Sequence, residues 1–99
     1  MTKSLIKTTA LALENNQELK LLYYITTKYV NQAPVFGVSV EKYLYNNIGD
    51  YDFVEVETES NLTYFKDTAT AIINGLSKNT VTPMGLICVL DEMMTEYIE

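Results

Sequence analysis

Through about the first sixty residues, apolar and β-branched side chains alternate with polar ones, and this period of two is typical of half-buried β-strands. The pattern predicts four strands, over residues of about 4–13, 18–29, 35–44 and 51–57. Short polar segments that contain asparagine separate these strands. Because the connections are short, an antiparallel meander is the default arrangement.

The connections differ in their turn chemistry. Asn15 and Asn16 tolerate positive φ and therefore suit a tight hairpin turn. Residues 31–34 and 46–50 form the other two predicted loops. Pro34 cannot donate a backbone hydrogen bond, so it marks the edge or the start of a strand.

Each of the two central strands has one clearly apolar face. These faces consist of Leu19, Leu21, Tyr23 and Ile25 in the second strand and of Phe36, Val38, Val40 and Leu44 in the third. The opposite face of the second strand carries Leu22 and Tyr24, so it is not clearly polar either. Both faces of the first strand carry apolar residues, which leaves its orientation open.

The last forty or so residues follow a helical period instead. We expect a first helix over residues of about 61–77, with Ser60 or Asn61 as its N-cap. Its apolar positions recur at spacings of three and four and form a single stripe that faces a core. The stripe consists of Leu62, Phe65, Ala69, Ile72 and Leu76.

We expect a second helix over residues of about 83–98. Thr82 is a favourable N-cap, and Pro83 takes the first helical position, where its missing N–H costs nothing. The apolar side chains span about half of the helix circumference. So wide an arc contacts both the sheet and the first helix, or else a partner. Candidate interface residues on this helix are Met93, Met94 and Tyr97.

Together these elements predict an α+β fold, a two-layer sandwich in which two C-terminal helices follow a four-stranded antiparallel meander. The length of 99 residues corresponds to a single domain, residues 1–99. With 47% hydrophobic residues and only four Gly and two Pro, the chain has enough apolar surface to form a core.

The charge of the chain argues against several classes of partner. Seven lysines face thirteen acidic residues, which gives a net charge of −6, and there is no arginine. Proteins that bind nucleic acids or anionic membranes usually carry a basic patch, and these lysines do not cluster. We therefore expect neither a nucleic-acid nor a membrane partner. The lone Cys88, the lack of a signal-peptide pattern and the lack of a long apolar run favour the reducing cytoplasm.

The chain offers few groups for catalysis. It has no histidine, no glycine-rich phosphate loop and no nucleophile elbow. Cys88 therefore has no base to activate it, and it lies on the side of the second helix that faces away from the apolar arc. That position fits an incidental surface thiol better than a redox sensor. We expect a protein that is not an enzyme and that needs no cofactor.

The fourth strand carries a row of acidic side chains. Glu55, Glu57 and Glu59 alternate along one face of it and of its exit. Such a row fits a weak divalent-cation site or a patch for a basic partner. It fits better a solvated face whose charges discourage pairing between sheet edges.

Tyrosine is enriched at protein interfaces, and eight of the 99 residues are tyrosine. If both helices cover the Tyr23 face of the sheet, then Leu22, Tyr24, Val35 and Tyr43 point outward together. An outward apolar patch indicates a protein partner or self-association as a homodimer. Two other arrangements would not indicate an interface: one helix on each face of the sheet, or aromatic side chains that are scattered singly over the surface.

Three segments resemble a known family. They are Leu-Leu-Tyr-Tyr at residues 21–24, Phe-Gly-Val-Ser-Val at residues 36–40, and residues 79–94, in which Asn-Thr-Val-Thr-Pro leads into the last helix. From about Leu19 onward the chain resembles small uncharacterised proteins of spore-forming anaerobic bacteria. That family often has His where this chain has Gly85, and an acidic residue where it has Cys88. The resemblance implies a bacterial cytoplasmic protein with this fold and implies no activity.

The sequence is therefore most consistent with a small, non-enzymatic protein-interaction or regulatory module of the bacterial cytoplasm. The alternative is a domain that binds a small molecule or a divalent cation at the acidic face of the fourth strand.

Overall fold

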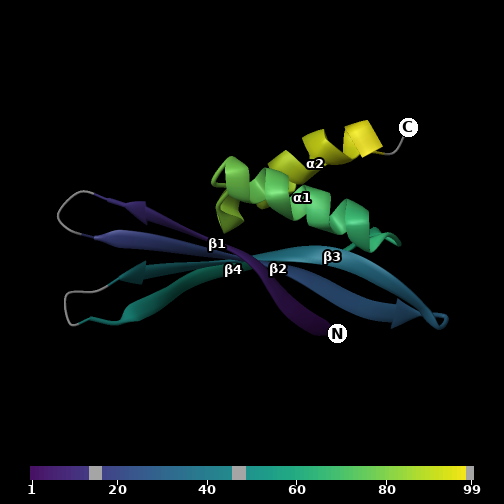
Figure 1. Ribbon diagram of the computed structural model, residues 1–99, viewed down its shortest axis with the longest axis horizontal. Helices are drawn as coiled ribbons and strands as arrows, with labels where there is room; N and C mark the ends of the chain where they lie inside the picture. The colour runs from purple at the N-terminus through teal and green to yellow at the C-terminus, as the bar shows by residue number, and fades with distance from the viewer. Residues whose placement is uncertain (14–16, 46–48, 98–99) are drawn as a thin grey trace.

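The computed structural model describes residues 1–13, 17–45 and 49–97, with side chains up to Met93. Its elements are the strands β1 (Thr2–Ala12), β2 (Glu18–Val30), β3 (Ala33–Tyr45) and β4 (Tyr51–Thr63), then the helix α1 (Lys66–Lys78), the 3-10 helix η2 (Pro83–Gly85) and the helix α2 (Leu86–Tyr97). The strands form one antiparallel sheet in the order β1-β2-β3-β4, and both helices pack on the same side of it (Figure 1). The predicted α+β meander with two C-terminal helices is confirmed.

The sheet is long, narrow and strongly twisted. Strands of 13 residues extend about 43 Å at the usual rise of about 3.3 Å per residue, in keeping with the longest molecular dimension of 47 Å. The end of the sheet that carries the β1–β2 and β3–β4 connections projects beyond the helices (Figure 1). The predicted turn at Asn15 and Asn16 and most of the predicted loop 46–50 lie outside the described residues.

The β2–β3 hairpin has a tighter connection than the sequence predicted. Asn31 and Gln32 have φ angles of 51° and 69°, which are typical of a two-residue turn whose twist matches that of the strands. Pairing resumes at once, so that Ala33 lies opposite Val30, and Pro34 lies opposite Tyr29. The loop predicted over residues 31–34 is therefore only two residues long, and Pro34 occupies the start of a strand, as predicted.

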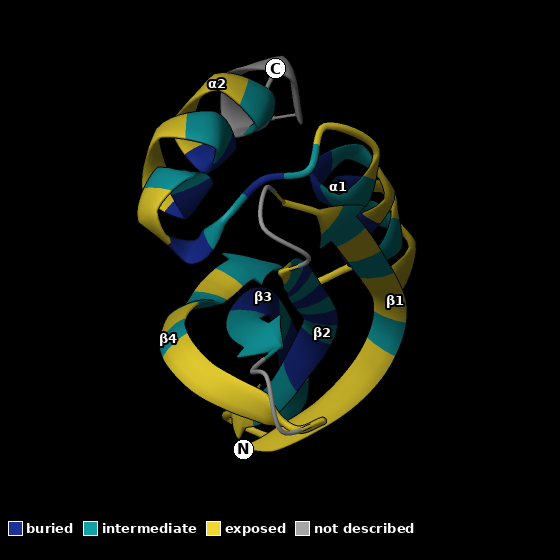
Figure 2. Ribbon diagram, turned by 90° about the vertical axis from the view of Figure 1, so that its left-hand side faces the viewer, coloured by how far each residue is buried: buried dark blue, intermediate teal, exposed yellow. Residues whose placement is uncertain are grey.

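The core lies between the helices and the two central strands (Figure 2). The register places the predicted apolar faces of β2 and β3 side by side, with Tyr23 opposite Val40. The sheet contributes Leu21, Tyr23, Ile25, Val38 and Val40, and the C-terminal part contributes Ala69, Ile72, Ile73, Leu76, Val81, Leu86 and Leu90. Within this core the Tyr23 hydroxyl donates a hydrogen bond of 2.9 Å to the Val81 carbonyl.

The boundary between β4 and α1 differs from the prediction. Strand β4 continues to Thr63, which lies opposite Phe36, so the predicted end near Glu57 is wrong. Ser60 and Asn61 lie in this strand and do not cap the helix, which begins at Lys66. The hydrogen bonds that the long strand β3 offers outweigh the local preference of these two residues for a helix start.

The predicted apolar stripe of the first helix is correspondingly shorter. Ala69, Ile72 and Leu76 are fully buried in the core, as predicted. Leu62 also packs against the core, but it comes from β4, and the Phe65 side chain is 70% exposed. The strand therefore places Leu62, whereas Phe65 is the N-cap residue of α1 and its side chain lies outside the core.

The second helix begins where the sequence predicted, at Pro83 with Thr82 as N-cap, but its first turn is a 3-10 turn. The Thr82 side chain makes no capping hydrogen bond. The Met93 side chain of α2 reaches Gly75 of α1, where an added Cβ would lie 2.6 Å from the Met93 methyl carbon. Gly75 thus weakens its helix but permits this contact.

Candidate functional site

The side of the sheet opposite the helices is the most prominent candidate surface. In the part of the chain that the structure describes, no helix packs on it, and we call it the helix-free face. By strand register its side chains are Lys3, Leu5, Thr8, Ala10 and Ala12 of β1, Glu18, Lys20, Leu22, Tyr24, Thr26, Lys28 and Val30 of β2, Ala33, Val35, Ser39, Glu41, Tyr43 and Tyr45 of β3, and Tyr51, Phe53, Val56 and Thr58 of β4.

Large apolar groups from all four strands reach this surface. Leu5 is 51% exposed, Phe53 55% and Val56 44%. The predicted interface residues Leu22, Tyr24 and Tyr43 lie among them and are half-buried. The structure therefore brings these three together.

Sequence reasoning missed Phe53 and Val56. Alternation with the acidic positions of β4 could have assigned Val56 to this face, but it would have placed Phe53 with Glu55. The irregularity in the β3–β4 pairing between Lys42 and Tyr43 is what brings Phe53 to the helix-free face.

A hydrogen-bonded carboxylate lies in the middle of this apolar surface. Glu41 forms an ion pair with Lys3 of β1 and accepts a hydrogen bond of 2.9 Å from the Tyr43 hydroxyl. Its side chain is only 14% exposed. The Lys3 ammonium also lies 4.6 Å from the centre of the Tyr24 ring, a cation–π distance. A half-buried charge is thus neutralised by a partner that is 38 residues away in the sequence.

This environment shifts the acidity of the groups around Glu41. Burial raises the pKa of Glu41, but the hydrogen bonds from Lys3 and Tyr43 and the charge of Lys3 lower it by more, so that it lies below its ordinary value. The hydrogen bond to Glu41 raises the pKa of Tyr43. Burial, followed by the charge of Glu41, raises the pKa of Tyr24. Near neutral pH the carboxylate is therefore ionised and both phenols are neutral.

The projecting end of the helix-free face is rich in aromatic rings and contains a hollow. The hollow has a volume of about 170 Å³ and is lined by Lys20, Leu22, Tyr43 and Tyr51. The Lys20 ammonium lies 5.0 Å from the centre of the Tyr51 ring. The Phe53 ring packs edge-on against the Tyr43 ring, with 5.6 Å between the ring centres. An exposed phenyl ring and an apolar hollow are therefore neighbours on one surface.

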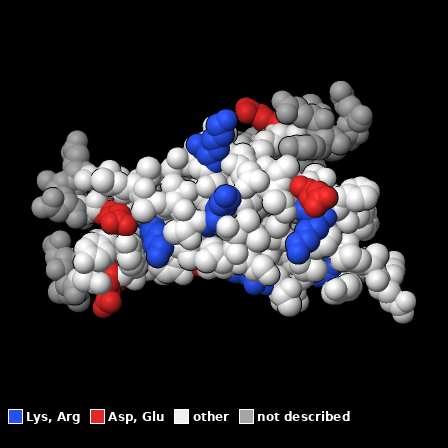
Figure 3. Space-filling model, viewed as in Figure 1, with Lys and Arg blue, Asp and Glu red and all other residues white. Residues whose placement is uncertain are grey.

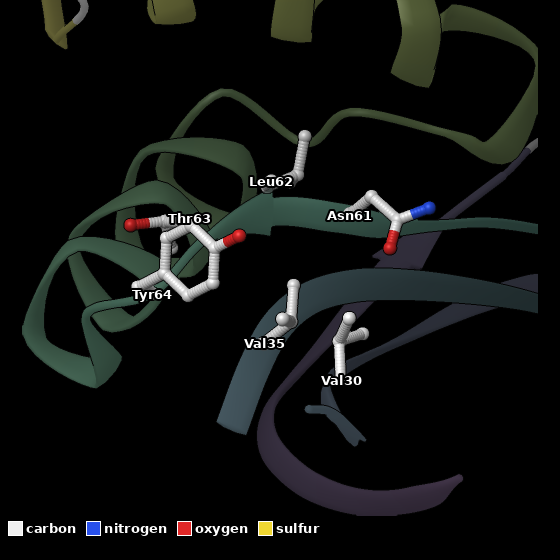
Figure 4. Close-up of a pocket in the computed structure, with 6 residues that line it drawn as sticks. All are labelled: Val30, Val35, Asn61, Leu62, Thr63 and Tyr64. Atoms are coloured by element: carbon white, nitrogen blue, oxygen red, sulfur yellow. The ribbon is translucent and has the colours of Figure 1, made fainter. Parts of the chain in front are cut away.

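A second cavity, of about 290 Å³, lies where β4 ends (Figure 4). It is lined by Val30, Val35, Asn61, Leu62, Thr63 and Tyr64. The predicted interface residue Val35 belongs to the helix-free face by register, but its side chain is only 6% exposed. It therefore forms part of this cavity wall and adds little contact surface. The lining holds no carboxylate, lysine or thiol, so the cavity contains no obvious acid–base pair.

The acidic row of β4 lies on the other side of the sheet. Glu55, Glu57 and Glu59 pair with Lys42, Val40 and Val38, which places all three on the side that bears the helices. Glu55 forms an ion pair with Lys42 at 3.8 Å. Among the described residues, no three His, Cys, Asp or Glu side chains converge in a way that could hold a metal ion. The shared face that the sequence predicted is real, but the row is spread along an edge strand.

The candidates on the second helix are only partly described. Met93 packs against the core beside Gly75. The side chains of Met94 and Tyr97 lie outside the described residues. Cys88 is an exposed free thiol, as the helical pattern predicted.

Charge is unevenly distributed between the helix-free face and the rest of the molecule. The face carries Lys3, Lys20 and Lys28 against Glu18 and Glu41, a formal balance of 3 − 2 = +1. The whole chain has a net charge of −6. In the view of Figure 3, some acidic and basic side chains lie next to each other, and uncharged surface separates these groups. The acidic residues of this protein therefore lie mostly away from the helix-free face.

Comparison with known proteins gives a family and no activity. Residues 2–96 match DUF6514, a family of unknown function. No curated protein and no solved structure matches the chain. In the described part of the chain, no helix is both long and apolar enough to span a membrane.

Proposed function

The chain belongs to the DUF6514 family, whose function is unknown, and we propose that it is a non-enzymatic interaction module that binds a second copy of itself through the helix-free face. One observation carries the proposal. Large apolar side chains are exposed at both edges of the side of the sheet without a helix, namely Leu5 on β1 and Phe53 and Val56 on β4. The half-buried Leu22, Tyr24 and Tyr43 lie between these edges on β2 and β3. Contiguous exposed apolar surface of this kind marks an interaction site.

The size of the face suits a dimer. Four strands about 4.8 Å apart and about 43 Å long outline on the order of 800 Å², within which Thr26, Val35 and Ser39 are already buried. A standard protein–protein interface buries about 800 Å² on each partner. Two sheets stacked face to face, with their side chains interleaved, are also an ordinary packing mode of β-proteins.

The charge distribution favours a second copy as the occupant. Two chains that each carry −6 repel each other, and the repulsion is least between surfaces that carry few acidic residues. The helix-free face carries about +1, and Glu41 is already paired with Lys3. Contact through this face therefore buries no unpaired carboxylate at its centre, a burial that would otherwise be costly.

The scarcity of groups arranged for acid–base catalysis supports a binding role. The chain has no histidine, and the larger cavity is lined by no carboxylate, lysine or thiol. The half-buried Glu41 is held by Lys3 and Tyr43, as a structural carboxylate is. An enzyme would need an acid or base that is free to exchange protons with a substrate.

A matched pair of substitutions tests the proposal. Val56→Asp places a charge on the helix-free face, and Ile87→Asp places the same charge on α2; the two parent side chains are 44% and 43% exposed. Sedimentation equilibrium at micromolar concentrations should show a dimer for the wild type and for Ile87→Asp, and a monomer for Val56→Asp. Far-ultraviolet circular dichroism checks that both variants fold.

Three results would contradict dimerisation through the helix-free face or favour another function. A wild type that stays monomeric at these concentrations would refute self-association, and a protein or ligand partner would take its place. A Val56→Asp variant that dimerises as well as Ile87→Asp would show that the interface lies elsewhere. A rise in thermal stability with millimolar Ca²⁺ or Mg²⁺ would instead support cation binding at the acidic row of β4.

A further inference from the structure

We propose that each copy inserts its Phe53 ring into the hollow of the other copy, so that this pair of contacts forms the energetic centre of the dimer. The inference rests on the proposed function, because it assumes that the helix-free face binds a second copy. It identifies Phe53 and the hollow as the features that determine the affinity of the dimer and the alignment of its two sheets.

The hollow fits a phenyl ring in size and in chemistry. Its volume is about 170 Å³, and a protein cavity of about 150 Å³ is known to accept benzene. Leu22 and the rings of Tyr43 and Tyr51 provide apolar walls. Lys20 provides a cation that already lies over the Tyr51 ring, and it would contact the face of an entering aromatic ring.

Phe53 is the side chain best placed to enter the partner's hollow, and we call it the knob. It is 55% exposed, which makes it the most exposed aromatic residue of the helix-free face, and its ring packs edge-on against Tyr43. Tyr43 also forms a wall of the hollow, so that knob and hollow share this residue. A buried aromatic anchor in a pocket is the usual hot spot of an interface.

In a two-fold symmetric dimer, the proximity of Phe53 to the hollow on each chain allows two equivalent contacts between the chains. In an isologous dimer, a contact of residue i with residue j is always accompanied by a contact of j with i. A two-fold axis that runs in the interface midway between Phe53 and the hollow places each knob over the partner's hollow. The hollow extends from Lys20 and Leu22 of β2 across Tyr43 of β3 to Tyr51 of β4, so its centre is displaced from Phe53 across the strands. This axis therefore runs roughly along the strands. The two sheets then stack with their strands aligned, as in β-sandwiches.

Isotope-filtered nuclear Overhauser spectroscopy tests this arrangement directly. A sample that mixes ¹³C-labelled and unlabelled wild-type chains reports only contacts between different copies. We expect an intermolecular signal between the Phe53 ring protons and the Leu22 methyl groups. This measurement uses the unaltered protein and does not depend on the folding of any variant.

Substitution provides a quantitative second test. Phe53→Ala and Leu5→Ala remove side chains of similar exposure, 55% and 51%, from the same face, but Leu5 lies on β1, away from the hollow. We expect Phe53→Ala to raise the dimer dissociation constant at least about 10-fold, as loss of a hot spot does. Leu5→Ala should raise it less than about 3-fold, as loss of a peripheral contact does. Circular dichroism checks the fold of both.

The outcomes separate this inference from the proposed function. A dimer that Val56→Asp disrupts, but that shows no Phe53–Leu22 signal and responds equally to Phe53→Ala and Leu5→Ala, overturns the knob-and-hollow contact and leaves the face as interface. A monomeric wild type overturns both proposals.

Discussion

Gly37 is the position where a single methyl group should do the most damage to this fold. An added Cβ at Gly37 would lie 2.1 Å from the Glu59 carbonyl oxygen and 2.5 Å from the Ser60 Cα. Here the pairing of β3 with β4 becomes irregular, because it passes from Glu59 directly to Thr63 while β3 advances from Val38 to Phe36. The chain of β4 presses against Gly37 at this irregularity, so only a residue without a side chain fits.

The cost of Gly37→Ala follows from what must move. The neighbours of the new methyl group are backbone atoms, which must retreat by about 1 Å to reach an ordinary contact, and β4 loses hydrogen bonds to β3 when they do. Overpacking usually costs about 1–3 kcal/mol, and more where the backbone shifts. Replacing Gly by Ala in an extended strand also stabilises the folded protein by about 0.5–1 kcal/mol, because it restricts the unfolded chain. Because backbone must move here, we take the upper end of the overpacking range, about 3 kcal/mol, and expect a net loss of about 2 kcal/mol or more from a total that is typically about 5–15 kcal/mol.

Urea unfolding followed by circular dichroism measures this loss, and two other glycines provide matched controls. At Gly75 the obstacle is the flexible end of Met93, so Gly75→Ala should change stability by less than about 1 kcal/mol in either direction. At Gly85 nothing lies within 4 Å, so Gly85→Ala should be neutral or slightly stabilising. On a domain of this size, Gly37→Ala should also lower the melting temperature by about 10 °C or more. An unfolding midpoint for Gly37→Ala equal to that of Gly85→Ala would refute the close approach of β4.

Further predictions concern the core and the polar groups. Tyr23→Phe leaves the buried Val81 carbonyl without its donor and should cost about 1–2 kcal/mol in urea unfolding. Burial raises the pKa of Tyr23 to about 12, so the folded protein keeps this proton above pH 10, where the unfolded chain loses it; wild-type stability should therefore fall between about pH 10 and 12, and less so in Tyr23→Phe. Leu76→Ala, at a fully buried core position, should cost about 2–5 kcal/mol by the same assay. The pKa of Glu41 is lowered on folding, so its contribution is present above its ordinary value of 4.5 and is lost as the pH falls; Glu41→Gln should flatten the dependence of the unfolding midpoint on pH in that acidic range. Cys88 is exposed, and Cys88→Ser should change stability by less than about 0.5 kcal/mol.

The candidate site was only partly predictable. Leu22, Tyr24 and Tyr43 follow from the alternation along β2 and β3, since side chains two residues apart point to the same face. Val35 follows the same alternation, but the cavity wall that buries it includes Asn61 and Tyr64, which lie far along the chain. No local pattern reports such a contact.

The sequence by itself determined where most strands and helices lie and which of their faces are apolar. The reason is local: a period of two or of 3.6 records which side of an element is buried, and Thr82 with Pro83 marks a helix start in any context. The tertiary structure alone decided the rest. Pairing with β3 carries β4 past the favourable helix caps Ser60 and Asn61, because a full row of strand hydrogen bonds outweighs one cap.

The packing of both helices on one side of the sheet was likewise decided only in three dimensions, and it is what leaves the helix-free face open. The same holds for the ion pair of Lys3 with Glu41, and for the hollow beside Phe53. These features join β1 to β3 and β2 to β4, strands that are distant in the sequence and that meet only through the twist and register of the sheet.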